Sequence, residues 1–385
     1  MKKILFIVPT LRGGGGTIRS LQNMLLLMPR LYNIDVLPMG YSNIGNTRLE
    51  NCNILRYNVI LSGIMSNIKY LDGFQFKNYV RLVKIILRGL SIIKLRHFVE
   101  NILFSIVARK INGYDTVIAY EEGACTFFTS KIKAQNKIAW IHCDYNKYLE
   151  NIKCKNEYRI YKKYHKIVCV SNFTLNNFLN IYPDFKNKSV CIYNTINKDL
   201  IIRASQEKIE DIPISTDRKI LLSIGRIVPV KQFSLIPEII SKITSNNFTW
   251  YLIGDIDDSS EFKILKEKLL IFNINEDKFI YLGHKDNPYP YIKCSDILIS
   301  LSRSEACPYV VNEAKILKVP VISNNYPSAY EFIINGHDGI ICSLEDMPTQ
   351  LDMILTDKLK LNTLKSHLMT LEYNNSLIQK IIDII

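Results

Sequence analysis

Two segments of this sequence begin in the same way, and their repetition constrains the fold more than any other feature. Residues 2–8 and 218–224 are each a short apolar run behind basic residues, bounded by glycine, and each precedes a stretch of helical periodicity. A buried strand that leads through a glycine turn into a helix is the opening of a doubly wound α/β domain. A chain of 385 residues also exceeds what one hydrophobic core usually serves. The sequence therefore predicts an α/β protein with two such domains.

Further apolar segments have the character of buried strands and alternate with helical stretches, as expected of βαβ units. They are 116–120, 137–141, 166–170, 190–193, 249–253, 279–282, 297–300 and 319–323. The polar stretch 194–217 separates the two openings and is predicted to be the linker. We therefore expect a first domain over 1–200, a second over 201–365, and a helix in 366–385 that can cross back to the first domain.

The charge of the chain is distributed unevenly. Residues 1–200 contain 29 Lys and Arg against 12 Asp and Glu, whereas the remainder contains 20 against 24. A basic half indicates an anionic partner such as a membrane surface, a lipid phosphate or nucleic acid. Richness in Ile, Asn, Lys and Tyr suggests an AT-biased genome, which would enrich lysine throughout but would not make the second half acidic.

Residues 77–111 place apolar side chains at helical spacing with Lys or Arg on the intervening face. This pattern predicts a pair of basic amphipathic helices. Two interpretations stay open, namely core-facing helices with solvated charges and helices that lie on a membrane surface. The apolar runs of the chain fall far short of the ~20 residues that a spanning helix needs. Nine cysteines without a C-x-x-C pair indicate reduced thiols and a cytoplasmic protein.

The glycine loop 13–16 directly follows the first predicted strand. Glycine lets the backbone approach a ligand, and the amides of the helix that follows favour a phosphate. The dinucleotide fingerprint G-x-G-x-x-G fails, because Ile18 or Arg19 stands where the third glycine belongs. A flexible structural turn is the alternative.

Arg226 and Lys231 follow the first strand of the second domain. Open α/β sheets bind ligands at the carboxyl ends of their strands. Arginine can clamp phosphate oxygens bidentately and lysine adds a point charge, so the pair suits a diphosphate. Ordinary surface charge is the alternative.

The stretch 302–317 places Glu305 and Glu313 eight residues apart with Pro308 between them. Proline is favoured at the first helical position, so we expect Glu305 in a loop and Glu313 inside a helix. Two carboxylates beside a diphosphate repel it unless they face hydroxyl groups. The layout therefore suits a nucleotide sugar, with helix amides toward the phosphates and carboxylates toward sugar and ribose hydroxyls. The spacing alone also arises by chance.

In this context the region resembles the donor domain of the family-four glycosyltransferases, also called glycosyl transferases group 1, which have the GT-B fold. The motifs that carry the resemblance span most of the second domain. They are Arg226, Lys231, Glu305 to Glu313, 319–323, Tyr281-Leu282-Gly283, 287–292, Ser295-Asp296, Glu331-Phe332-Ile333, Gly336 and Gly339.

The resemblance implies two Rossmann-like doubly wound domains facing a cleft, with the donor bound mainly to the second and the acceptor to the first. It implies that Arg226 and Lys231 neutralise the diphosphate together with helix amides near Pro308. Glu313 would bind the ribose, and Glu305 would contact the hydroxyls of the donor sugar.

In the first domain the resemblance implies that Gly16 approaches the donor phosphates. His142, in the run Trp-Ile-His-Cys-Asp, matches the active-site histidine of the family, and Asn194 marks the return toward the hinge. A lone histidine beside an apolar strand is more often a satisfied core residue, which is the alternative for His142.

Two departures from the family pattern concern the donor site. Ala306-Cys307 precedes Pro308 where the family usually has glycine after the glutamate, and the added Cβ would narrow the sugar site. Thr17 and Ile18 follow the glycines in place of Ala-Glu.

The run Asp255, Asp257 and Asp258 mimics an Asp-x-Asp metal site. Because Arg226 and Lys231 already supply positive charge, we expect neither a bound metal nor a cofactor.

The resemblance thus implies a retaining glycosyltransferase that uses a nucleoside-diphosphate sugar, and we expect UDP rather than GDP. Its expected acceptor is a saccharide or a polyprenyl-phosphate-linked molecule, in bacterial cell-surface polysaccharide synthesis. We expect a cytoplasmic location, peripheral on the inner face of the plasma membrane, and no nucleic acid, because no such binding motif is present. The alternatives are a nucleotide-sugar epimerase of the same fold and a non-enzymatic membrane-surface protein on a degenerate scaffold.

Overall fold

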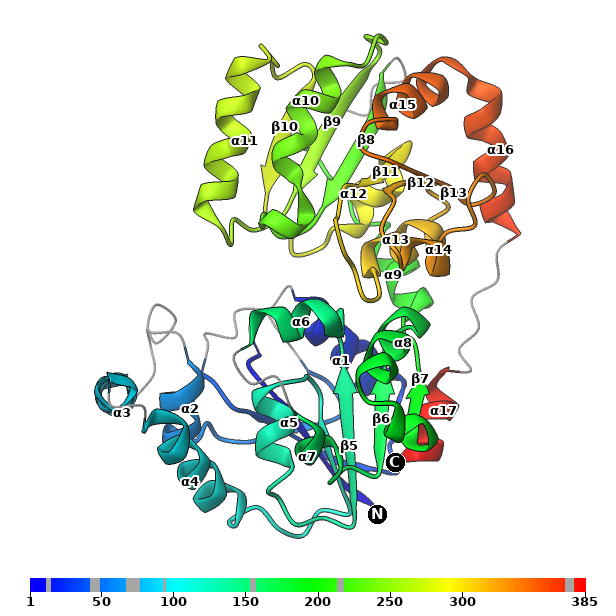
Figure 1. The fold of residues 1–385 in the computed structure, drawn as a ribbon. Coiled ribbons are helices and arrows are strands. Elements are labelled where there is room, and N and C mark those ends of the chain that lie inside the picture. Colours follow the sequence, from blue (N-terminus) through cyan, green and yellow to red (C-terminus); the bar gives the residue numbers. More distant parts are fainter. Residues whose placement is uncertain are drawn as a thin grey trace. The chain divides into compact units, whose positions relative to one another are not determined.

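The computed structural model describes residues 1–11, 15–41, 49–66, 77–92, 95–152, 157–212, 218–370 and 377–385. The chain forms two compact units, Met1–Ile196 with Asn375–Ile385 and Asn197–Asn374. Each unit contains one parallel sheet with helices on both faces (Figure 1). None of the helices in these residue ranges is long and apolar enough to cross a membrane.

The sheet of the first unit has the strand order β3-β2-β1-β4-β5-β6-β7. Its strands are β1 (Lys3–Val8), β2 (Asn33–Pro38), β3 (Asn53–Ile54), β4 (Thr116–Ala119), β5 (Asn136–Ile141), β6 (Lys166–Cys169) and β7 (Ser189–Cys191). Its helices are α1 (Gly16–Leu27), α2 (Val59–Met65), α3 (Lys77–Ile92), α4 (Arg96–Ala108), α5 (Ala124–Thr129), α6 (Tyr145–Asn151), α7 (Tyr158–Tyr161), α8 (Asn172–Ile181), the 3-10 helix η2 (Pro183–Lys188) and α17 (Leu377–Ile384).

The sheet of the second unit has the order β10-β9-β8-β11-β12-β13. Its strands are β8 (Lys219–Ile224), β9 (Phe248–Ile253), β10 (Phe279–Gly283), β11 (Ile297–Ser300), β12 (Val321–Asn324) and β13 (Gly339–Cys342). Its helices are α9 (Lys198–Ala204), the 3-10 helices η3 (Pro229–Lys231) and η4 (Phe233–Leu235), α10 (Ile236–Ser241), α11 (Ser259–Ile271), α12 (Tyr289–Cys294), α13 (Tyr309–Ile316), α14 (Ala329–Phe332), α15 (Met347–Thr356) and α16 (Lys358–Met369).

Both sheets are buried on both faces, which explains the continuous apolar runs of their central strands. Every residue of β4 and of β9 is buried, as are Ile4 to Val8 of β1. In both sheets the strand order reverses next to the first strand of the unit, between β1 and β4 and between β8 and β11. Such a reversal opens a crevice at the carboxyl ends of the strands, where ligands bind in this class of fold.

All of the expected strands are present, with bounds shifted by up to two residues, but in the part of the chain that the structure describes three others were missed. β2 contains the polar residues Asn33 and Asp35, β3 has only two residues, and β13 is a short run that begins with Gly339. None of these gives a continuous apolar signal.

The stretch 194–217, which was predicted to be the linker, contains a short helix, and 213–217 lie outside the described residues. α9 forms inside this stretch because the Asn197 side chain accepts a hydrogen bond from the Leu200 backbone amide, at 3.0 Å, and Ile201 is buried. The division between the units at Ile196 lies slightly before residue 200.

The end of the chain belongs to the first unit from Asn375 onward, whereas α16 belongs to the second. The backbone carbonyl of Ile385 accepts a hydrogen bond from Thr116 Oγ1 at 2.8 Å, and that of Ile384 accepts one from Asn136 Nδ2 at 2.9 Å. Ile381 and Ile385 are buried. α17 therefore contributes to the packing at the amino ends of β4 and β5.

α2 and α3 cross closely at Gly63. A Cβ atom added to Gly63 would lie 2.5 Å from Val83 Cγ1 of α3, which is closer than side-chain packing permits. Gly89, also in α3, has no atom within 4 Å of its added Cβ position. The packing of α2 against α3 therefore requires glycine at position 63 but not at position 89.

We expect Gly63→Ala to lower the free energy of unfolding by about 1–3 kcal/mol, because overpacking forces α3 away from α2. Gly89→Ala is the matched control, and it should raise stability by about 0.5–1 kcal/mol, since alanine is the better helix former. Denaturant unfolding of both variants checks this pair, and equal effects of the two substitutions would contradict the close crossing.

Candidate donor site and active site

The carboxyl ends of β8 and β11 in the second unit carry four of the predicted site residues. Arg226 follows β8 after Gly225, Lys231 ends η3, and Glu305 lies in the loop between β11 and α13. Glu313 lies inside α13, so the predicted division into one loop and one helical carboxylate is confirmed.

Lys231 and Glu305 form an ion pair between Nζ and Oε1, although they lie far apart in the sequence. Ser302 Oγ donates a second hydrogen bond to the same carboxylate oxygen at 2.7 Å. The Ser328 hydroxyl donates to the backbone carbonyl of Glu305. Both charged side chains are about four-fifths covered, at 21% and 18% exposed. The loop that holds Glu305 is thus fixed from β8, β11 and the turn before α14.

Arg226 belongs to a separate ion pair, in which its Nη1 atom lies 3.1 Å from Asp257 Oδ2. Its side chain is 54% exposed, so the guanidinium faces solvent. The backbone beside it requires glycine, because a Cβ on Gly254 would lie 1.7 Å from the Gly225 carbonyl oxygen. The loops after β8 and β9 are therefore in close contact at Gly225, the residue before Arg226.

The Glu313 side chain has no exposed surface in this structure. Its Oε1 atom accepts a hydrogen bond from the Tyr289 hydroxyl of α12 at 3.2 Å. Burying an ionised carboxylate is costly unless it is hydrogen-bonded, so Tyr289 stabilises this position. A ribose could reach Glu313 only after some of the atoms that cover it have moved.

Pro308 was expected at the first helical position, and this was wrong by one residue. The structure places it at the N-cap of α13, with φ −73° and ψ 106°, and the helix begins at Tyr309. An N-cap residue has extended rather than helical backbone angles, which proline can adopt. Because proline has no N–H, the amides of the first turn start at Tyr309.

The aspartates that resemble a metal motif have other partners. Asp255 lies 3.1 Å from His284 Nδ1, Asp257 pairs with Arg226, and Asp258 caps α11 by accepting bonds from the Ser260 and Glu261 amides. Across the described residues, no group of three or more His, Cys, Asp or Glu side chains is placed to hold a metal ion.

In the first unit, Gly16 is the first residue of α1 and is exposed. Gly15 is the N-cap, and no side chain caps the first turn of the helix. The helix end therefore offers backbone amides and its positive dipole to an anion. Gly13 and Gly14 lie outside the described residues.

His142 follows β5 at the same edge of the sheet as Gly16. Its backbone amide donates to Glu122 Oε2 at 2.9 Å, and its ring stacks at a tilt on Tyr120, with centroids 4.8 Å apart. The Nε2 atom is buried and has no hydrogen-bond partner among the described residues. Buried polar atoms are nearly always partnered, so this nitrogen is placed for a ligand or water.

A buried polar network beside His142 was not predicted. Ser20 Oγ of α1 lies 2.7 Å from the Tyr120 hydroxyl and donates to Asn194 Oδ1 at 2.8 Å. Ser20 and Tyr120 are fully buried, and Asn194 nearly so. The network joins α1 to the ends of β4 and β7, and since its members lie up to 174 residues apart, no local sequence pattern could reveal it.

The fold agrees with that of GT-B glycosyltransferases over the whole chain. HepE of Anabaena, solved in complex with UDP-glucose, superposes with a TM-score of 0.75 over 100% of this chain and 99% of its own, at 13% identity. A glycosyltransferase from Rickettsia africae superposes with a TM-score of 0.69 over 100% and 97%, at 20% identity. At these identities the likeness shows the fold alone, which is the predicted α/β fold of two Rossmann-like domains.

The family Glycosyl transferases group 1 matches residues 204–366. The second unit is therefore similar to group 1 glycosyltransferase domains, as the resemblance implied. An uncharacterized 41.2 kDa protein in the cps region of Klebsiella pneumoniae is 30% identical over 169 residues, 42% of this chain and 43% of its own length. N-acetyl-alpha-D-glucosaminyl L-malate synthase of Bacillus anthracis is 27% identical over 163 residues, 42% of each. The matched region thus spans less than half the length of these relatives.

Burial lowers the pKa of His142 from 6.5 to about 3. Between pH 6.5 and pH 3 this histidine is protonated in the unfolded chain but stays neutral in the folded protein. The free energy of unfolding therefore falls as the pH drops below 6.5. We expect the melting temperature of His142→Asn, whose side chain does not titrate, to fall less between pH 7 and pH 4 than that of the wild type.

NMR spectra test the same ring directly. The His142 ring should not titrate between pH 8 and pH 5, and a midpoint near 6.5 would contradict the buried neutral ring.

Proposed function

We propose that this chain is a retaining glycosyltransferase that transfers a sugar from a UDP-sugar to a saccharide or lipid-linked acceptor. The observation that carries the proposal is the cluster Lys231, Glu305 and Arg226 at the carboxyl ends of β8 and β11 of a group 1 glycosyltransferase domain. UDP is favoured because a structure of the same fold, HepE, was solved with UDP-glucose.

The charges of the site suit a diphosphate leaving group. Each cation is held by one carboxylate, Lys231 by Glu305 and Arg226 by Asp257, so both are positioned before a donor binds. A diphosphate would share these cations, and Glu305 would turn to hydroxyl groups of the donor sugar. Positive groups that are already in place stabilise the charge that grows on the leaving diphosphate without reorganisation.

We assign the remaining roles as follows. Glu313 binds the ribose, and the first-turn amides of α13 after Pro308 face the phosphates. In the first unit, the backbone at Gly16 approaches the donor phosphates. The neutral His142 ring offers its Nε2 atom to a hydroxyl group of the donor sugar. Retention needs no protein nucleophile if the acceptor attacks from the face that the diphosphate leaves. A role in cell-surface polysaccharide synthesis is supported by the relative in the cps region.

Arg226→Ala and Glu313→Gln should each weaken UDP binding by about 1.5–3 kcal/mol, as expected for the loss of a hydrogen bond to a charged group. Calorimetric titration with UDP measures this. Glu313→Gln keeps the volume of the buried side chain, and Lys263→Ala, on the exposed face of α11, is the control that should bind UDP like the wild type. Unchanged affinity in both site variants would refute the assigned donor site.

Transfer should continue in the presence of EDTA, because Arg226 and Lys231 supply the charge that neutralises the diphosphate. The measurement is UDP release from a UDP-sugar before and after chelation. A strict requirement for Mn²⁺ or Mg²⁺ would contradict this part of the proposal.

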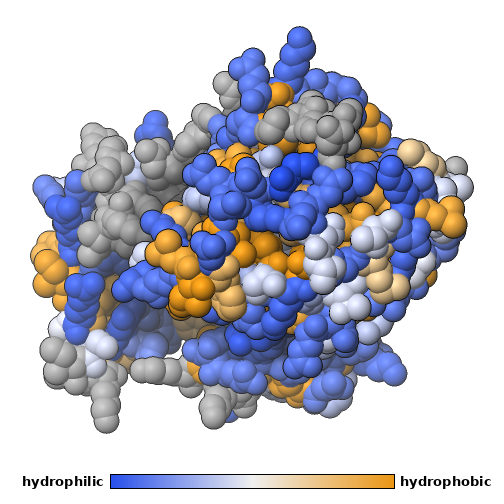
Figure 2. All heavy atoms as spheres, turned by 90° about the horizontal axis from the view of Figure 1, so that it is seen from above, coloured by the Kyte–Doolittle hydropathy of each residue, from blue (hydrophilic) through white to orange (hydrophobic). Residues whose placement is uncertain are grey.

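We also propose that the first unit docks on an anionic bilayer through α3 and α4. Large apolar side chains are exposed on both helices, among them Leu82 at 54%, Ile85 at 65% and Phe98 at 63%. Figure 2 shows hydrophobic side chains at the left edge of the molecule, on the side where Figure 1 places α3. Apolar side chains beside cations are typical of helices that lie in the membrane interface, and the basic residues 1–200 complement an anionic surface.

The double variant Leu82→Ser/Ile85→Ser should lose most of its binding to phosphatidylglycerol vesicles while retaining UDP binding. Leu270→Ser/Ile271→Ser is the matched control, because these side chains are exposed at 83% and 74% on α11 of the second unit. Co-sedimentation at low and high salt measures binding. Equal binding to anionic and neutral vesicles, or equal loss in both double variants, would overturn the docking proposal.

A further inference from the structure

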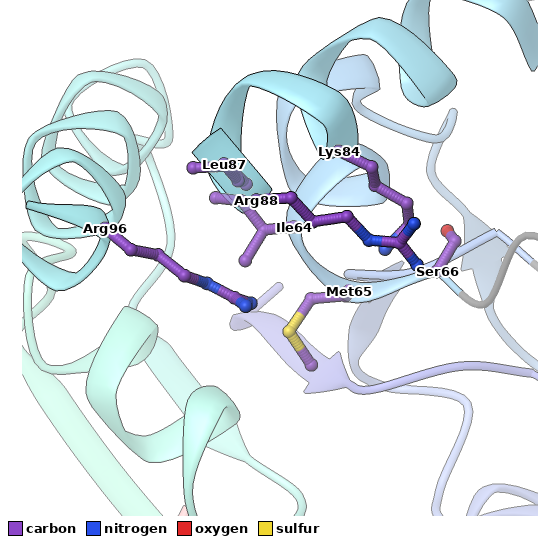
Figure 3. Close-up of a pocket in the computed structure, with 8 residues that line it drawn as sticks. Ile64, Met65, Ser66, Lys84, Leu87, Arg88 and Arg96 are labelled. Carbon is purple, nitrogen blue, oxygen red and sulfur yellow. The ribbon is translucent and has the colours of Figure 1, made fainter. Parts of the chain in front are cut away.

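A cavity of about 350 Å³ lies in the first unit among α2, α3 and α4, apart from the residues assigned to the donor and to catalysis. Figure 3 shows the side chains that line it. They are Ile64, Met65 and Ser66 from the end of α2, Lys84, Leu87 and Arg88 from α3, and Arg96 from α4, together with Gly63.

Three cations line this cavity. Lys84 and Arg88 stand one turn apart on α3, and Arg96 reaches in from the first turn of α4 (Figure 3). Arg96 donates from Nε to Glu100 Oε1 at 2.7 Å, and that carboxylate is the acidic group beside them. Within the described residue ranges, neither Lys84 nor Arg88 has a carboxylate partner at ion-pair distance. Among the described side chains, these three cations and the Glu100 carboxylate leave an excess of about two positive charges.

The cations that line the cavity repel one another. The pKa of Lys84 is lowered first by burial and then by the charges of Arg96 and Arg88, and Glu100 offsets this only in part. Like charges that lie close together destabilise the fold unless acids offset them, and Glu100 offsets these cations only in part. Such an arrangement is typical of a site shaped for an anion.

The cavity is joined by hydrogen bonds to the ligand-binding edge of the sheet. Ser66 Oγ accepts from the backbone amide of Tyr41, just after β2, at 2.7 Å. The Gly40 amide in turn donates to the Pro9 carbonyl, just after β1, at 2.8 Å. A group bound in the cavity would thus lie near the carboxyl ends of β1 and β2.

We propose that this cavity binds a phosphate or diphosphate group that carries about two negative charges, through Lys84, Arg88 and Arg96. Arginine and lysine together bind phosphate oxygens by charge-assisted hydrogen bonds, and a charge excess near two matches a phosphomonoester or a diphosphate diester. In a glycosyltransferase of the proposed kind this group belongs to the acceptor, so the assignment of the ligand, but not of the site, rests on the proposed function. The exposed apolar side chains of α3 and α4 would then lie beside the lipid part of that acceptor.

A structural role for the same cations makes a different prediction. The last carbonyl groups of α2 carry partial negative charge, and Lys84 and Arg88 could serve only to offset it. In that case Lys84→Gln/Arg88→Gln would lower the melting temperature and leave anion binding unchanged. The anion site predicts the opposite, an equal or higher melting temperature together with lost anion binding.

The test uses the full chain and inorganic pyrophosphate as the probe in calorimetric titrations. We expect Lys84→Gln/Arg88→Gln to weaken one class of pyrophosphate binding at least ten-fold and to leave UDP binding unchanged. Arg81→Gln/Lys110→Gln is the matched control, because it removes two exposed cations of the same unit that do not line the cavity. Pyrophosphate binding by the Lys84 and Arg88 double variant equal to that of the control would overturn the proposal.

The donor site can also bind pyrophosphate, so the same titration is made with Arg226→Ala. Binding that is lost in Arg226→Ala and kept in Lys84→Gln/Arg88→Gln would overturn the cavity site while the donor site stands. Binding lost only in Lys84→Gln/Arg88→Gln supports the cavity site even if no transferase activity is found. The two proposals can therefore fail separately.

The source of the phosphate group is distinguished by three ligands. Tighter binding of farnesyl diphosphate than of pyrophosphate, again lost in Lys84→Gln/Arg88→Gln, supports a lipid-linked acceptor. Equal binding of the two supports a soluble phosphate ester. Binding to phosphatidylglycerol vesicles that depends on Lys84 and Arg88, with no binding of either diphosphate, would overturn the dianionic site and leave a bilayer headgroup contact.

Discussion

The arrangement of both units depends on one constraint, the need to bury parallel strands on both faces while their hydrogen bonds are satisfied within the sheet. Helices must then cover both faces, and the strand order must reverse where the chain moves from one face to the other. In this protein the reversal lies beside β1 in the first unit and beside β8 in the second. The loops at those two places carry Gly16 on one sheet and Arg226, Lys231 and Glu305 on the other.

At the second of these places, ion pairs and hydrogen bonds organise the charges. Lys231 and Glu305 come from loops after two different strands, and their ion pair holds both loops in one arrangement. Ser302 and Ser328 fix the same loop from its own strand and from the next turn. In the donor site that we propose, Lys231 is already held in place, as electrostatic stabilisation of a leaving group requires.

The sequence predicted the parts of this structure that depend on local pattern. The continuous apolar runs of β1, β4, β8 and β9 follow from burial on both faces, and the placement of Glu305 in a loop and Glu313 in a helix follows from Pro308 between them. β2 was missed because Asn33 and Asp35 interrupt its apolar run. α9 was missed because a short capped helix in a polar stretch has little hydrophobic periodicity.

Contacts between distant residues could not be predicted in the same way. The pairing of Lys231 with Glu305, that of Arg226 with Asp257 and the network of Ser20 with Tyr120 and Asn194 each join loops or helices that only the folded sheet brings together. The cavity cations also needed the structure, because the sequence showed Lys84 and Arg88 on an amphipathic helix but not that Arg96 faces them. Gly63, at the close crossing of α2 and α3, also lines this cavity.

The central claim is that the second unit activates a nucleotide sugar by stabilising its diphosphate as the sugar leaves. The most direct measurement is the release of free UDP from a panel of UDP-sugars. It compares the wild-type chain with Lys231→Ala, after circular dichroism has shown that the variant is folded. The account predicts UDP release from at least one sugar nucleotide by the wild type and a loss of at least a hundred-fold in Lys231→Ala, as for the removal of a charged group that stabilises a transition state. Release at the same rate by both proteins, or an epimerised nucleotide sugar without any release of UDP, would contradict it.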